Sequence, residues 1–186
     1  NIYAHIQLAC LAYRQGDSNK CNSLFDEARK MFPTSPEIPN YYGEILFDRQ
    51  DFDGALKQFD ISIKLQKAGK GYSIGALPLV NESAIYQRKG ETEKSIKLLK
   101  DACELDPKSE VARLSLGQAF LAEQNVDEAI KLFDEACTLA RSSEERTQAI
   151  SLMEASKMQL KIREDPVLSK KVQEVLSNFP QAAGEL

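Results

Sequence analysis

Apolar residues recur along most of the chain at intervals of three and four positions, the spacing that places them on one face of an α-helix. These helical stretches come in pairs, and each pair is joined by a short polar turn. The four turns are Gln15-Gly16-Asp17, Arg49-Gln50-Asp51, Lys89-Gly90-Glu91 and Gln124-Asn125-Val126. Pro33 and Pro107 follow the second helix of a pair, where a helix should end. The pattern predicts an all-α chain of helical hairpins.

One period relates the hairpins to each other. Three columns of small residues and one column of large residues each repeat at intervals of 34, 40 and 34 positions. The small columns are Ala9/Gly43/Ser83/Gly117, Cys21/Ala55/Ser95/Ala129 and Ala28/Ser62/Ala102/Ala136, and the large column is Phe25/Phe59/Leu99/Phe133. Because small side chains let helices approach closely, we expect the large column to fill the space beside them.

The period divides the chain into expected segments. Residues 1–141 should form four hairpins, over about 2–31, 36–65, 73–105 and 109–140, with the six extra residues of the middle interval as a loop insertion at 67–72. Residues 142–180 should form a long helix, about 143–164, and a capping helix that begins at Pro166. Residues 181–186 should be a frayed tail. The first helix is apolar nearly all round, so we expect a further repeat before it and a longer parent protein.

The period and the small columns resemble the tetratricopeptide repeat, over roughly residues 2–141. One column departs from that family: the aromatic residue usual near the start of each repeat is replaced by His5, Pro39, Leu79 and Arg113. The resemblance implies a right-handed solenoid of helical hairpins, closed here by the capping helix.

Composition and charge exclude several functions. The chain of 186 residues has 24 basic and 28 acidic residues, and its net charge of −4 argues against a nucleic-acid partner. No apolar run is long enough to predict a membrane span. Four well-separated cysteines without metal-ligand spacing indicate packed, reduced thiols rather than a metal site.

The candidate chemistry does not favour catalysis. His5, the single histidine, has no plausible triad partners, and Gly69 and Gly71 lack the strand and helix that a phosphate loop needs. No pair of carboxylates is demonstrably adjacent. We therefore expect that the protein is not an enzyme and uses neither a metal nor a cofactor. Its function should depend on a binding surface instead.

That surface should be the groove lined by the first helix of each hairpin. Residues three before, one after and four after the Ala9/Gly43/Ser83/Gly117 column should point into it. This rule, extended to the long helix, selects Ile6, Cys10, Tyr13, Asn40, Glu44, Phe47, Val80, Ala84, Gln87, Leu114, Gln118, Leu121, Gln148 and Leu152, with Ala155 continuing the row. Glu37, Glu44, Asp48 and Glu145 should make the groove partly acidic, so it suits a peptide with hydrophobic and basic residues.

A carboxylate-binding clamp for chaperone tails is not expected. Such a clamp needs convergent cations, and the corresponding positions hold residues such as Cys10, Glu44 and Val80. Direct binding of a chaperone tail by these repeats is therefore disfavoured.

Several longer stretches resemble the seventy-kilodalton import receptors of the mitochondrial outer membrane, fungal type. They include residues 6–14, 32–60, 75–80, 101–110, 127–141 and, most specifically, 144–179. The resemblance implies a receptor on the cytosolic face of that membrane that captures mitochondrial precursor proteins, notably carriers with internal signals. It also implies contacts with other translocase subunits, and an anchor and chaperone-docking repeats in upstream sequence. A generic scaffold and a co-chaperone adaptor remain as alternatives.

Overall fold

The structure, a computed structural model, describes residues 1–69 and 73–178, and this part of the chain consists of ten α-helices without a strand. The all-α prediction is therefore confirmed. The helices are α1 (Ile2–Arg14), α2 (Ser18–Met31), α3 (Glu37–Asp48), α4 (Phe52–Lys67), α5 (Leu77–Arg88), α6 (Thr92–Leu105), α7 (Glu110–Ala122), α8 (Val126–Leu139), α9 (Ser143–Glu164) and α10 (Pro166–Asn178).

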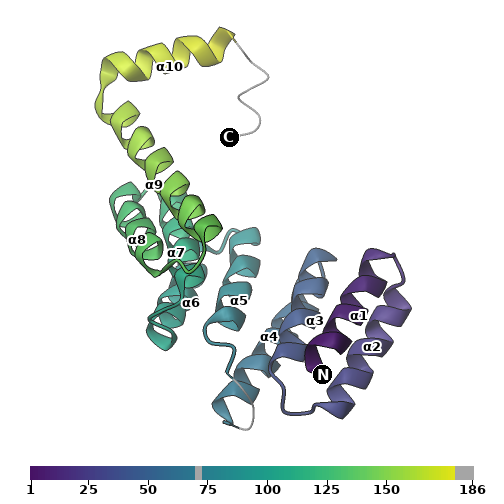
Figure 1. Ribbon diagram of the computed structural model, residues 1–186. Helices are drawn as coiled ribbons and strands as arrows, with labels where there is room; N and C mark the ends of the chain where they lie inside the picture. The colour runs from purple at the N-terminus through teal and green to yellow at the C-terminus, as the bar shows by residue number, and fades with distance from the viewer. Residues whose placement is uncertain (70–72, 179–186) are drawn as a thin grey trace.

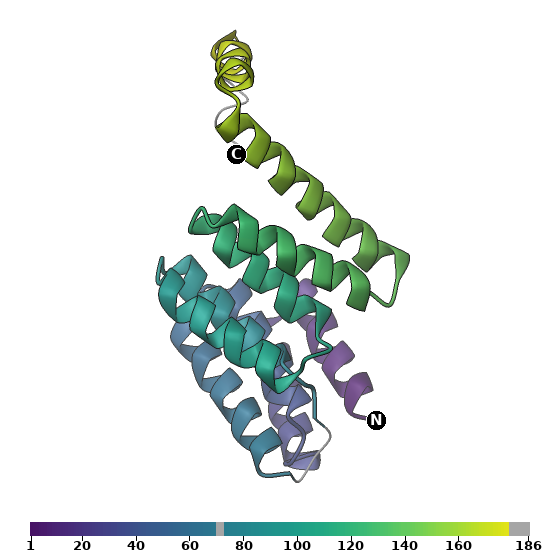
Figure 2. The same ribbon diagram turned by 90° about the vertical axis from the view of Figure 1, so that its left-hand side faces the viewer.

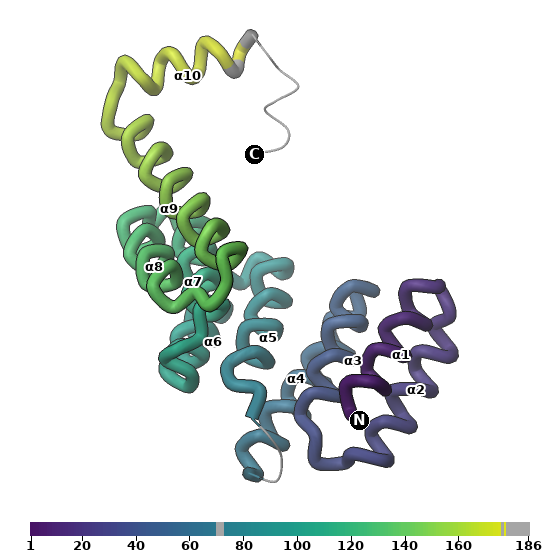
Figure 3. The backbone as a smooth tube through the Cα atoms, viewed as in Figure 1, coloured from purple at the N-terminus to yellow at the C-terminus, as the bar shows by residue number. Residues whose placement is uncertain are grey.

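Four antiparallel hairpins, α1–α2, α3–α4, α5–α6 and α7–α8, stack in chain order into a solenoid (Figures 1 and 3). The first helices contact each other in succession, α1 with α3, α3 with α5 and α5 with α7, whereas α2, α4, α6 and α8 make no comparable contacts with one another within the described residues. The closely spaced first helices therefore form the inner layer of the stack, and the second helices form the outer layer.

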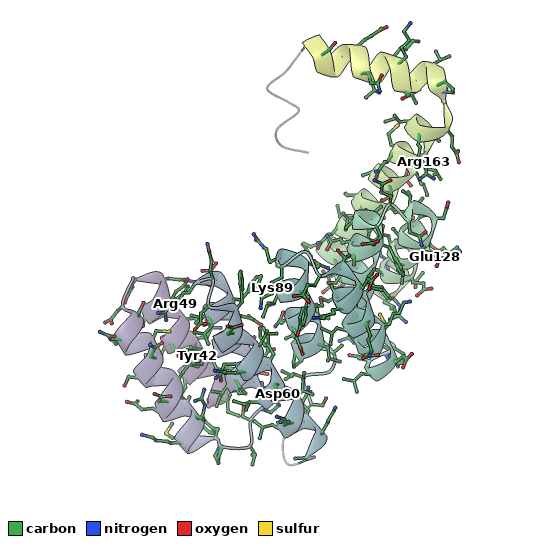
Figure 4. All side chains as sticks on the ribbon, turned by 180° about the vertical axis from the view of Figure 1, so that it is seen from behind. Tyr42, Arg49, Asp60, Lys89, Glu128 and Arg163 are labelled. Atoms are coloured by element: carbon green, nitrogen blue, oxygen red, sulfur yellow. The ribbon has the colours of Figure 1, made fainter. Side chains whose placement is uncertain are left out.

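The turns inside the hairpins share one backbone feature. Gly16, Gln50, Gly90 and Gln124 all have a left-handed conformation, with φ of 81°, 62°, 73° and 58°. Asp17 and Asp51 then cap the second helices by accepting bonds from the amides of Lys20 (2.9 Å) and Gly54 (3.0 Å). Because the turns are alike, Arg49 and Lys89, which follow α3 and α5, lie along the same edge of the molecule (Figure 4).

The small and large columns pack against each other, as the sequence predicts. A Cβ atom at Gly43 would lie 2.5 Å from Cε1 of Phe59, and a Cβ atom at Gly117 would lie 2.5 Å from Cε1 of Phe133. Phe25, Phe59, Leu99 and Phe133 are all buried. The hairpins α3–α4 and α7–α8 are thus closed by a phenylalanine on the second helix against a glycine on the first.

The core consists of four hydrophobic clusters arranged along the solenoid. The two in the first half share Tyr42, and the two in the second half share Phe120. At α5 the halves meet without a shared residue: Ile85 packs with Leu46 and Phe59, whereas Val80 packs with Leu99 and Leu116. The helix α5 is therefore the boundary between two separately packed pairs of hairpins.

The C-terminal helices leave the stack. A capping box of Ser142 and Glu145 begins α9, which packs on α8 and then projects beyond the hairpins (Figure 2). A helix is present at the expected place as α10, but it packs against the end of α9 rather than over the hairpin stack, and it leaves Val167 and Val175 exposed. In the predicted loop 67–72, Lys67 ends α4 and residues 70–72 lie outside the described residues, as does the predicted tail 181–186.

Candidate functional site

The inner layer carries a row of accessible side chains at most of the predicted groove positions. These residues are half-buried or exposed and come from the four inner helices and from α9: Cys10, Tyr13, Glu44, Phe47, Ala84, Gln87, Gln118, Leu121, Gln148 and Leu152, with Ala155 exposed beyond them. The row combines apolar, amide and carboxylate groups. It can therefore bury apolar side chains of a ligand while it pairs polar ones.

Four of the predicted positions are inside the protein instead. Ile6 and Asn40 are fully buried, and Val80 and Leu114 are 8% and 6% exposed. These four residues lie three positions before the small column, where the side chain packs against the neighbouring hairpin: Ile6 joins the cluster that contains Ile38, and Leu114 joins the cluster that contains Ala149. They support the groove from beneath and do not line it.

A polar network joins α3 to α5 in the floor of the groove. The Asn40 amide donates to Oε1 of Glu44 (2.8 Å), and the Asn81 amide donates to the same oxygen (2.9 Å) and to Oδ1 of Asn40 (3.2 Å). Burial raises the pKa of the Glu44 carboxyl, and the two amides oppose this effect by stabilising its charged form. The network places a partly desolvated carboxylate among apolar neighbours.

Two charged residues, Asp48 and Arg88, flank the groove near its N-terminal half. The Tyr13 hydroxyl donates to the Asp48 carboxylate, and this bond raises the pKa of the tyrosine. Asp48, Phe47, Phe52 and Arg88 line a cleft of about 410 Å³ together with Gln50. The ring centroids of Phe47 and Phe52 lie 5.7 Å apart. The cleft is therefore lined by two aromatic rings together with the acidic Asp48 and the basic Arg88.

Two of the predicted acidic groove residues have structural roles. Glu37 is only 6% exposed and accepts a bond from the Ser35 hydroxyl (2.6 Å). Glu145 accepts bonds from the backbone amides of Arg141 (2.7 Å) and Ser142 (3.2 Å) at the start of α9. The prediction that Glu37 adds charge to the groove is wrong, because its side chain is buried, whereas Glu145 is partly exposed and takes part in the capping box of α9.

Asn81 is the important residue that the groove rule does not select. It lies one position after Val80, so the rule assigns it to the side of α5. Asn81 follows Asn40 by 41 positions in the sequence, yet in the structure its side-chain amide donates a hydrogen bond to Oδ1 of Asn40 (3.2 Å). Because the 40-residue interval makes Val80 the repeat equivalent of Asn40, Asn81 is offset by one residue, and the period alone does not show that it reaches the neighbouring helix.

Residues 1–69 and 73–178 offer neither a metal site nor a membrane span. This part of the chain has no group of three or more His, Cys, Asp or Glu side chains placed to hold a metal ion. None of its helices is both long enough and apolar enough to span a membrane. All four cysteines are free, and Cys21 is buried in the core.

The hairpin stack with an accessible inner layer defines a class of helical-repeat binding proteins. Two models of the tetratricopeptide repeat match residues 6–69 and 87–146, which together make up more than half of the chain. The chain belongs to the tetratricopeptide-repeat family. This family comprises binding and scaffold proteins rather than enzymes.

The resemblance to mitochondrial import receptors is also confirmed. The chain is 48% identical over 177 residues to the mitochondrial import receptor subunit TOM70 of Saccharomyces cerevisiae, which covers 94% of this chain and 29% of that protein. It is 28% identical over 155 residues to human TOM70, covering 81% of this chain and 24% of that protein. The crystal structure of yeast Tom70 matches with a TM-score of 0.76 and 47% identity, over 94% of this chain and 36% of that one. The chain thus spans about a quarter to a third of the length of these relatives.

Proposed function

We propose that the inner layer of this solenoid binds segments of mitochondrial precursor proteins, including the internal signals of carrier-type precursors, during import at the cytosolic face of the outer membrane. The observation that carries the proposal is the continuous row of accessible side chains on α1, α3, α5, α7 and α9. Its support is the 48% identity with a mitochondrial import receptor subunit over nearly the whole chain.

The chemistry of the row fits a segment that is mainly hydrophobic. Phe47, Leu121 and Leu152 are half-buried, so each still has apolar surface that a ligand can cover. Gln87, Gln118 and Gln148 are exposed and can pair with a peptide backbone. A receptor must release its cargo, so we expect an affinity of about 1 μM, which corresponds to roughly −8 kcal/mol.

Fluorescence anisotropy of this chain with three labelled peptides tests the proposal. The peptides are a segment of a mitochondrial carrier, a scrambled version of it and an acidic chaperone C-terminal tail. Saturable binding of the carrier segment alone is the expected result. Equal binding of the scrambled peptide, or no binding of the carrier segment, would refute the proposal, and binding of the acidic tail would favour a co-chaperone adaptor.

A pair of variants locates the site. Leu121→Arg places a charge on the inner helix α7 and should weaken binding of the carrier segment at least about tenfold, since it removes apolar contact and adds a cation opposite a basic ligand. Leu105→Arg is the matched control, because Leu105 is 60% exposed at the end of the outer helix α6. Equal affinities of two folded variants would remove Leu121 from the site.

A further inference from the structure

The Glu44 carboxylate is anchored by one of its oxygens only. Both amide donors, from Asn40 and Asn81, bind Oε1. Within the described residues Oε2 accepts no hydrogen bond, and it is not among the buried side-chain atoms that lack a partner. Because Glu44 is half-buried, this oxygen reaches the surface of the groove.

No cation of the described chain pairs with Glu44. None of the ion pairs in this part of the molecule includes it. The neighbouring helix α1 contributes Cys10, whose thiol pKa is raised, chiefly by burial and also by Glu44, against the opposing effect of Arg14. The charge of Glu44 is therefore stabilised by neutral amides alone, although burial disfavours that charge.

An anchored carboxylate with one free oxygen in a partly apolar floor is suited to a cation supplied by a ligand. A Lys or Arg side chain can lay its aliphatic stem against apolar surface and place its charged end on Oε2. The two amides hold the carboxylate in place, so little side-chain freedom remains to be lost when the cation arrives. A neutral side chain at the same point would leave the carboxylate desolvated and unpaired, which disfavours its binding.

We propose that Glu44, positioned by Asn40 and Asn81, is a specificity site that accepts one basic side chain of the bound segment at the junction of α3 and α5. This inference rests on the proposed function, since it assigns one contact within the same groove. It makes the groove selective for a lysine or arginine inside an otherwise apolar stretch, rather than for net positive charge.

The test uses two versions of the labelled carrier segment. One version keeps a single lysine, and the other has norleucine there, which preserves the aliphatic stem and removes the charge. The wild-type chain should bind the lysine peptide about tenfold more tightly, the size expected for a charge-assisted hydrogen bond. In Glu44→Gln, which keeps the side-chain size, the ratio should fall to about one.

Two further variants separate a local role from a general one. Glu82→Gln removes a second half-buried carboxyl, on α5, whose pKa is raised by burial and by Asp60 of the outer helix α4; the lysine preference should remain. Asn81→Ala removes one anchor of Glu44, and the preference should decrease while norleucine binding stays the same.

The possible failures are distinguishable. If neither peptide binds the wild-type chain, the proposed function fails and the inference fails with it. If both bind but Glu44→Gln keeps the lysine preference, the inference alone is overturned. An equal loss in Glu82→Gln would mean that the preference reflects overall charge, and this too would overturn the inference.

Discussion

Gly43 lies directly against the ring of Phe59, so that a methyl group on this glycine would be 2.5 Å from Cε1. Gly43→Ala should therefore destabilise the protein by about 1–3 kcal/mol, since the gain in helix propensity is smaller than the cost of overpacking. Urea denaturation measures the change. Gly43→Ala should destabilise a Phe59→Leu protein by less than it destabilises the wild type, because the smaller side chain removes the clash. Equal destabilisation in the two backgrounds would contradict the contact.

The left-handed turn residues Gln50 and Gln124 should be improved by glycine. Their φ values of 62° and 58° are unfavourable for a side chain. Gln50→Gly and Gln124→Gly should each stabilise the chain by about 0.5–1 kcal/mol, seen as a higher urea midpoint with an unchanged slope. Gln118→Gly, in the middle of α7, is the control and should destabilise by about 1 kcal/mol. A loss of stability at Gln50 would show that the turn needs its side chain.

Capping should differ between equivalent turns. Asp51 accepts a bond from the Gly54 amide (3.0 Å), whereas Asn125, at the equivalent position, makes no side-chain cap bond. Asp51→Ala should therefore destabilise by about 1 kcal/mol and Asn125→Ala by clearly less. Thermal unfolding of the two variants measures the difference, and equal losses would argue against the role of the cap bond.

The Glu44 carboxyl should make stability depend on pH. Burial raises its pKa in the folded chain, so the native state binds more protons than the unfolded state in this range. The stability that the protonated Glu44 contributes is therefore lost as pH rises from the ordinary pKa of glutamate through the raised pKa of the folded chain. The groups that face it are Cys10 of α1, Tyr41 and Asn40 of α3, and Asn81 of α5.

Glu44→Gln isolates this effect. The free energy of unfolding of the variant, relative to that of the wild type, should increase as pH rises from mildly acidic to neutral. Above the raised pKa of Glu44 the difference between the two proteins should stay constant. Urea denaturation of both proteins across this range gives the comparison. A difference that does not change with pH would mean that the carboxyl has the same pKa folded and unfolded.

The fold could be predicted from the sequence because its determinants are local and repeated. The small columns and the large column together indicate a pair of contacting helices in each repeat. The glycines and polar residues of the turns mark where these helices end. The same information was repeated four times, so an atypical repeat did not obscure it. The place where α5 begins was less predictable, since the extra residues follow no period.

The groove could be predicted only in part. Helical spacing indicates which side of α1 or α7 faces inward, but it does not show how deep a side chain lies. Ile6 and Leu114 are on the correct face and yet are buried, because the neighbouring hairpin covers that edge. The contact between Asn81 and Glu44 depends on the offset between two helices, which is a tertiary property absent from the pattern of either one.

The division of the core at α5 makes this helix part of two packed units, since Ile85 belongs to one and Val80 to the other. Each pair of hairpins is held together by a shared aromatic residue, Tyr42 in the first and Phe120 in the second, while the boundary has no such link in the described chain. The Glu44–Asn81 hydrogen bond spans this boundary, so a ligand that pairs with Glu44 would contact both packed units at once.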